Sequence, residues 1–133
     1  MCLFCKIANH DIDSYIVYED TYYIAFLDIN PVSLGHTLIM PKTHYDDFTE
    51  CPSQVVKEMH EIALKLIEHY GDCIKPLGYN FLSNAKAVSG QSINHLHFHL
   101  IPRYGDSDGY DLHFHKIESA IPNSTLCQSL RVL

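Results

Sequence analysis

The chain has 133 residues, of which 47% are hydrophobic and 19% charged, and its formal net charge is −7. This length and composition predict a single domain over residues 1–133 with a core of its own. The acidic balance argues against nucleic-acid binding, which needs a basic surface. Apolar runs are far shorter than the roughly 20 residues of a membrane span, and the opening residues lack a basic segment followed by an apolar stretch. We therefore expect a cytoplasmic protein without nucleic-acid or membrane partners.

The first third of the chain predicts a short helix and three antiparallel strands. The helix is expected over Leu3 to Ala8. Segments 15–19 and 22–28 are rich in β-branched and aromatic residues and flank a polar turn, which predicts a hairpin. Gly35 precedes a third strand, from His36 to Met40.

One long helix is expected next, from Pro52 or Ser53 to about Tyr70. Ser53 or Thr49 is expected to cap its first turn, and Gly71 to end it. Its core-facing stripe at helical spacing consists of Val55, Val56, Met59, Ile62, Ala63, Leu66 and Ile67.

Two more strands complete the predicted order, one over 79–84 and one through the histidines that begin at His95. Residues after Arg103 show no clear period. Strands, a helix and further strands without βαβ alternation predict an α+β fold. We expect a five-stranded antiparallel sheet with one long helix and a short N-terminal helix.

The last strand carries a chemical signal, because histidines occupy every second position in Asn94-His95-Leu96-His97-Phe98-His99-Leu100-Ile101. On a strand this spacing points three imidazoles to one face and the apolar side chains to the other. A face that is merely solvated would more cheaply use Thr, Lys or Glu. His97 can attack phosphorus if its other ring nitrogen donates to a fixed acceptor. Alternatively, two of the histidines hold a catalytic metal.

Two further motifs bear on the chemistry. Gly90-Gln91-Ser92 precedes the histidines and offers uncharged hydrogen-bond donors, which suits an anion cradle. The pair Cys2 and Cys5 favours metal binding, because an odd count of five cysteines does not suggest a disulfide framework. The isolated cysteines are expected to be small buried hydrophobes, namely Cys51, Cys73 and Cys127.

These blocks together resemble the histidine triad (HIT) family of nucleotide hydrolases and transferases. The run 95–101 matches the family's alternating signature. Other blocks match in the same order: 25–31, 35–44, Asn84, 90–92 and 101–103. The resemblance covers about residues 2–104, which is the expected motif-bearing core. It leaves 105–133 as a C-terminal tail, in which His113 and His115 are interpreted as incidental.

The resemblance implies that His97 attacks the α-phosphorus of a purine nucleotide and forms a nucleotidyl-histidine that water resolves. The implied substrates are nucleotide phosphoramidates or dinucleoside polyphosphates, and nucleotidyl transfer is a related outcome. Residues implied to hold the phosphate or assist the leaving group are His99, Gln91, Ser92 and Asn84, with His36 as a further active-site histidine. Asp28 is implied to bind the ribose hydroxyls. Apolar positions implied around the purine are Phe4, Ile7, Ile12 and Phe26.

One position departs from the family pattern. Lys86 stands two residues after Asn84, where family members commonly have glycine. A lysine there is expected either to add charge at the mouth of the phosphate site or to alter the shape of the loop. Substrate preference, not reaction class, depends on it.

The resemblance extends to a zinc-binding subset of the family. It implies a structural Zn²⁺ held by Cys2, Cys5, His44 and His95, which would make His95 a ligand without a role in proton transfer. It also implies a homodimer whose sheet continues across a two-fold axis. The alternative is a nucleotide-binding sensor or scaffold with little turnover, although such a protein needs no nucleophile.

Overall fold

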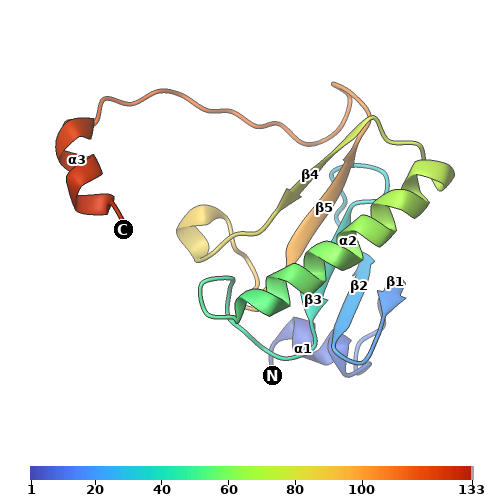
Figure 1. Cartoon of the computed structure of the whole chain (residues 1–133). Helices are drawn as coiled ribbons and strands as arrows, with labels where there is room; N and C mark the ends of the chain where they lie inside the picture. The colour runs from blue at the N-terminus through green and yellow to red at the C-terminus, as the bar shows by residue number, and fades with distance from the viewer. Residues whose placement is uncertain (133) are drawn as a thin grey trace.

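The computed structural model describes residues 1–132, and Figure 1 shows the arrangement of its elements. In chain order they are α1 (Leu3–Ala8), β1 (Ile16–Glu19), β2 (Tyr23–Leu27), β3 (Thr37–Pro41), α2 (Ser53–Cys73), β4 (Gly78–Leu82), the 3₁₀ helix η1 (Ala87–Ser89), β5 (Phe98–Arg103) and α3 (Asn123–Leu130). The predicted α+β fold is confirmed.

The five strands form one antiparallel sheet in the order β1-β2-β3-β5-β4. The hairpin predicted at the start of the sheet is β1-β2. β5 enters between β3 and β4, and Leu38 of β3 is paired with His99 of β5. This register places His36, the residue before β3, beside the C-terminal end of the histidine run.

Period-two alternation in β2 and β3 separates two apolar clusters on opposite faces of the sheet. Tyr23, Ala25 and Ile39 belong to the larger core under α2, together with the helix residues Met59, Ile62, Ala63, Leu66 and Tyr70. The alternate residues of β2 and β3 face α1 and belong to a smaller cluster. This cluster contains Phe4, Ile7, Ala8, Ile24, Phe26, Leu38 and Met40. Figure 1 shows α2 lying across the sheet. The stripe predicted on the long helix is confirmed as core.

α2 begins at Ser53, as predicted, but no side chain caps its first turn. It also passes through Gly71 to Cys73. A glycine inside a helix costs only about 1 kcal/mol relative to alanine, so it does not by itself stop one. The actual end follows at Lys75, whose left-handed φ of 51° lets its N–H donate to the carbonyl of Tyr70.

The histidine strand is shorter than predicted. β5 begins at Phe98, so only His99 of the three histidines lies on a regular strand. Upstream, the backbone N–H of Leu96 donates to the carbonyl of Tyr45 at 2.7 Å rather than to β3. The alternation survives this change, because Leu96 and Leu100 are buried in the core under α2.

The tail contains a helix that the sequence did not predict. Figure 1 shows α3 at the end of an extended segment, away from the sheet. Two cysteines also differ from expectation, since Cys73 and Cys127 are exposed rather than buried. Within residues 1–132, no helix has the length and apolar character needed to cross a membrane.

Candidate active site

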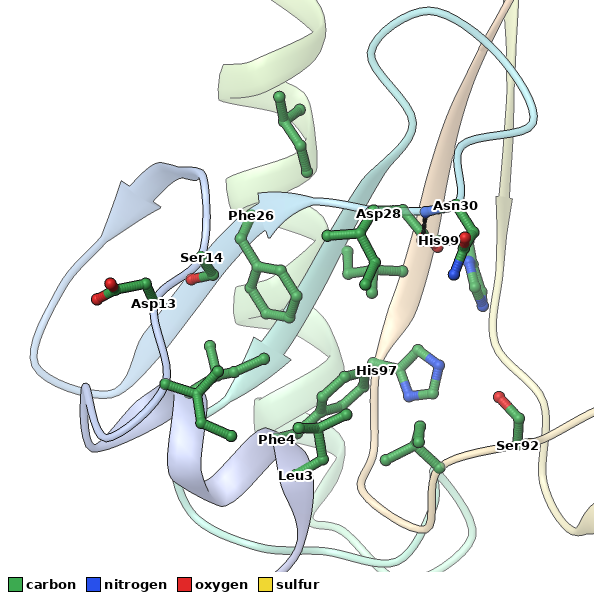
Figure 2. A pocket seen from close by; sticks show the side chains of 16 residues that line it. Leu3, Phe4, Asp13, Ser14, Phe26, Asp28, Asn30, Ser92, His97 and His99 are labelled. Carbon is green, nitrogen blue, oxygen red and sulfur yellow. Dashed lines mark hydrogen bonds between the residues drawn. The ribbon is translucent and has the colours of Figure 1, made fainter.

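A pocket of about 300 Å³ opens between α1, the end of β2 and the start of β5. Figure 2 shows His97, His99 and Ser92 at one end of it, with Phe4 and Phe26 farther along. Eight of the predicted site residues line this pocket: Phe4, Ile7, Ile12, Phe26, Asp28, Ser92, His97 and His99. Asp13 and Ser14 also line it, and no motif in the sequence had indicated them. Asn30, from the matched block 25–31, lines it as well.

His97 has the tautomer that a nucleophile needs. Its Nδ1 lies 2.7 Å from the carbonyl oxygen of His95, which can only accept a hydrogen bond, so Nδ1 carries the proton. Burial lowers the pKa of the ring, so the imidazole is neutral near pH 7. Phe4 packs against it in a T-shaped arrangement, with ring centroids 5.0 Å apart. A neutral ring protonated at Nδ1 leaves a lone pair on Nε2.

His36 fixes the opposite tautomer in His99. The backbone N–H of Val32 donates to His36 Nδ1 at 3.2 Å, so the proton of the neutral ring lies on Nε2. That N–H donates to His99 Nδ1 at 2.9 Å, which leaves the His99 proton on Nε2. His36 is itself buried, and burial lowers its pKa. The pocket therefore holds one imidazole with a free lone pair beside one with a free N–H.

The pKa of His99 is lowered from 6.5 to about 4, because burial disfavours the charged ring and His97 and His36 oppose its charge. Unfolded chains bind this proton near pH 6.5 and folded chains only near pH 4, so the contribution of the neutral ring to stability is lost as pH falls between them. From pH 7 to 4.5 we expect the wild type to lose about 2 kcal/mol more unfolding free energy than His99→Gln.

Urea unfolding at several pH values measures this difference. His69→Gln, at an exposed histidine on α2, serves as the control and should follow the wild-type curve. Equal losses for the wild type and His99→Gln would contradict the assignment.

Asp28 directly follows β2 and lines the pocket. One carboxylate oxygen accepts from the backbone N–H of Asn30 at 2.8 Å, a bond drawn in Figure 2. The other lies 3.6 Å from His36 Nε2. A carboxylate held in this way retains acceptor capacity toward the pocket.

Residues 90–92, at the end of the 84–92 loop, are predicted to cradle an anion, and the structure places Ser92 and Gln91 differently. Ser92 lines the pocket. Gln91 is buried, and its amide donates to the carbonyls of Asp46 and Ile93 while its oxygen accepts from the backbone N–H of Lys86. These three bonds tie the 84–92 loop to Asp46 and Ile93. A contact between Gln91 and the phosphate stays a prediction.

The other two residues singled out in this loop also lie outside the pocket lining. Asn84 stands beside Gly90, where an added Cβ would lie 3.6 Å from the Asn84 side-chain nitrogen. Lys86 directs its ammonium to Asp47 Oδ2 at 2.9 Å. Of the two expectations for Lys86, added charge at the phosphate site or altered loop shape, the structure favours the second.

Cys2, Cys5, His44 and His95 converge at the N-terminus of α1. Their ligand atoms lie within 4.8 Å of one another. Sulfur to Nδ1 separations are 3.4–3.6 Å, and the two Nδ1 atoms are 3.2 Å apart. Tetrahedral zinc, with bonds of about 2.3 Å to sulfur and about 2.05 Å to nitrogen, requires separations of about 3.6 Å and about 3.3 Å.

The tautomers of the two histidines also suit a metal. His95 Nε2 donates to the carbonyl of Pro41 and His44 Nε2 to Asp46, both at 2.8 Å, so each Nδ1 has a free lone pair. Such partners are typical of metal-bound histidines. The donor set therefore fits a closed four-ligand ion. Among residues 1–132, no cluster of potential ligands combines His95 with His97, so the alternative of a catalytic metal shared by these two histidines finds no support.

The comparisons with known proteins agree with this arrangement. Residues 9–106 match the HIT domain. A HIT-like protein of Methanocaldococcus jannaschii is 43% identical over 122 residues, covering 90% of this chain and 91% of its own. An adenosine 5'-monophosphoramidase of Schizosaccharomyces pombe is 35% identical, covering 81% of this chain and 78% of its own. The crystal structure of a HIT family protein from Bacillus subtilis superposes with a TM-score of 0.86 at 37% identity, covering 97% of this chain and 94% of that chain.

The domain match and the fold lead to the same result independently. The sequence match reaches from the end of α1 past the histidine run, and the structural match extends over nearly the whole chain. We therefore assign this chain to the HIT domain family.

Proposed function

We propose that this protein hydrolyses nucleoside 5'-phosphoramidates, with adenosine 5'-monophosphoramidate as the first candidate substrate. The observation that carries the proposal is the pair of opposite tautomers, a lone pair on His97 Nε2 beside an N–H on His99 Nε2. Two yeast relatives are adenosine 5'-monophosphoramidases, which supports this substrate class. Dinucleoside polyphosphates and nucleotidyl transfer involve the same first step.

In the proposed reaction, His97 Nε2 attacks the α-phosphorus while the P–N bond to the leaving amine breaks. The amine takes up a proton from water as it departs, and a nucleotidyl-histidine forms. A water molecule then attacks phosphorus and releases a proton to the solvent, the P–N bond to His97 breaks, and the nucleoside monophosphate leaves. The His99 N–H and the Ser92 hydroxyl are placed to stabilise phosphate oxygens, because both line the same end of the pocket.

The rest of the pocket suits a nucleoside. Apolar side chains from α1 and β2, including Phe4 and Phe26 with ring centroids 5.7 Å apart, form a wall against which a purine can pack. The retained acceptor capacity of Asp28 suits the two hydroxyls of a ribose.

Asp28→Asn is expected to raise KM for adenosine 5'-monophosphoramidate about tenfold and to change kcat little, because a ground-state contact is weakened. The matched 2'-deoxy substrate should show a smaller rise, which steady-state kinetics on both substrates will measure. Asp11→Asn, at an exposed position outside the pocket lining, is the control. An identical rise on both substrates would contradict a ribose contact.

We also propose that Zn²⁺ occupies the Cys2, Cys5, His44 and His95 cluster as a structural ion. Its ligands join α1 to the end of β3 and to the segment before β5. The ion supplies cross-linking, and the chemistry is left to His97 and His99. The fit of the donor separations to tetrahedral geometry supports this proposal.

A homodimer is our proposal for the working assembly. β4 lies at one edge of the sheet. The tail that follows β5 exposes apolar side chains, such as Phe114 at 84% and Ile117 at 82%, which are typical of a surface that packs against another chain. Sedimentation equilibrium tests this, and a mass equal to the 15.2 kDa chain alone would contradict it.

The decisive test of function incubates the purified protein with adenosine 5'-monophosphoramidate and follows the release of adenosine monophosphate (AMP). A parallel assay uses a dinucleoside polyphosphate. Turnover of the phosphoramidate is the expected result. Tight AMP binding in calorimetry without turnover of either substrate would instead favour a nucleotide-binding sensor.

A further inference from the structure

Lys86 holds a backbone conformation that lysine rarely adopts. Its φ of 76° and ψ of 158° lie in a region that is essentially restricted to glycine. Such a conformation persists only where surrounding contacts enforce it.

The side chain of Lys86 provides one of these contacts. Its ammonium lies 2.9 Å from Oδ2 of Asp47, a carboxylate that is fully buried at the base of the 46–50 segment. The other oxygen of Asp47 accepts from the backbone N–H and the hydroxyl of Thr49. A buried carboxylate is costly without a counter-charge, so Lys86 and Asp47 hold each other in place.

The backbone of Lys86 organises the 84–92 loop. Its N–H donates to the Gln91 side-chain oxygen at 2.8 Å, and its carbonyl accepts from the backbone N–H groups of Ser89 and Gln91. Gln91 in turn donates to the carbonyl of Asp46, beside Asp47. The conformation at Lys86 therefore connects the start of the loop to Ser92, which lines the pocket.

We propose that the Lys86–Asp47 ion pair is a latch that holds the 84–92 loop in its phosphate-binding conformation. Lys86 is then a positioning residue that determines affinity for the nucleotide phosphate without touching it. The proposal rests on the proposed function for the identity of the ligand. Loss of the ion pair is expected to weaken nucleotide binding rather than to slow the chemical step, because in this proposal Ser92 of the loop contacts the phosphate both before and during that step.

Lys86→Met keeps a long, unbranched side chain but removes its charge. We expect KM for adenosine 5'-monophosphoramidate and the Kd for AMP to rise about tenfold, with kcat within about twofold. Asp47→Asn should have the same effect, and the double variant should also be about tenfold weaker rather than about a hundredfold, because both changes break one interaction. Lys86→Arg should restore wild-type values.

Lys86→Gly separates the latch from simple misfolding. Glycine adopts a φ of 76° without strain, so this variant loses the ammonium but can keep the backbone conformation that Lys86 has. We expect the same rise in KM and Kd, with a melting temperature at or above that of Lys86→Met. The control is Lys65→Met, which removes another exposed ammonium, one that lies over the ring of Tyr18 in β1, at the opposite edge of the sheet from β4.

Wild-type AMP affinity in both Lys86→Met and Lys86→Gly would overturn the latch. A wild type that binds AMP but does not hydrolyse the phosphoramidate would contradict the proposed function alone. The Kd measurements on AMP would then still decide whether the ion pair sets phosphate affinity.

Discussion

His97→Asn is expected to lower kcat for adenosine 5'-monophosphoramidate by about 10⁴-fold or more, because the attacking lone pair is lost. Asparagine retains an N–H that can donate to the His95 carbonyl in place of Nδ1. It therefore removes the nucleophile and keeps the local hydrogen bond. AMP release in steady state measures the loss.

The covalent step has its own readout. Wild-type protein quenched during turnover should carry a nucleotidyl adduct on the peptide that contains His97, and His97→Asn should carry none. His69→Asn on the exposed face of α2 should keep both turnover and adduct. Turnover of His97→Asn within about tenfold of the wild type would rule out His97 as the nucleophile.

Cys5→Ser is expected to release zinc and to lower the free energy of unfolding by about 4 kcal/mol or more, since the cross-link between α1 and the sheet is lost. The melting temperature should fall by roughly 10 °C or more. Elemental analysis should give one zinc per chain for the wild type and a clear deficit for the variant. Thermal unfolding with and without a chelator provides the second measurement.

The matched control for this prediction is Cys51→Ser, at a half-buried cysteine outside the cluster. It should retain zinc and melt near the wild-type temperature. At temperatures where the chelated protein remains folded, we expect kcat within a few-fold of the wild type. Abolished chemistry in folded, chelated protein would argue for a catalytic ion instead.

The elements of the fold were largely predictable because their signals are local. Alternation in β2 and β3 and helical spacing in α2 identify core faces from neighbouring residues alone. Boundaries were less predictable. Gly71 lies inside α2 because tertiary packing outweighs the small helical penalty of glycine, and β5 starts late because Leu96 pairs with Tyr45.

The residues of the pocket were predictable mainly through the resemblance to a family. Apolar positions such as Ile12 carry no chemical signal of their own, and they line the pocket only because α1 folds back against β2. The partners of Gln91 could not be read from its motif. Its place beside the histidines predicts a phosphate contact, and the folded chain adds hydrogen bonds from its carboxamide to the backbone of Lys86 and Asp46.

The amino-acid order alone shows that three histidines alternate with apolar residues, and that pattern places imidazoles opposite the core. The different surroundings of His95, His97 and His99 arise when the chain folds. Each ring's proton is placed by its partner, and two of those partners, Pro41 and His36, are distant in sequence. The third, the carbonyl of His95, accepts from His97 where the chain has not yet joined the sheet. Spacing orients side chains, but a tautomer depends on an acceptor or donor that only the folded chain supplies.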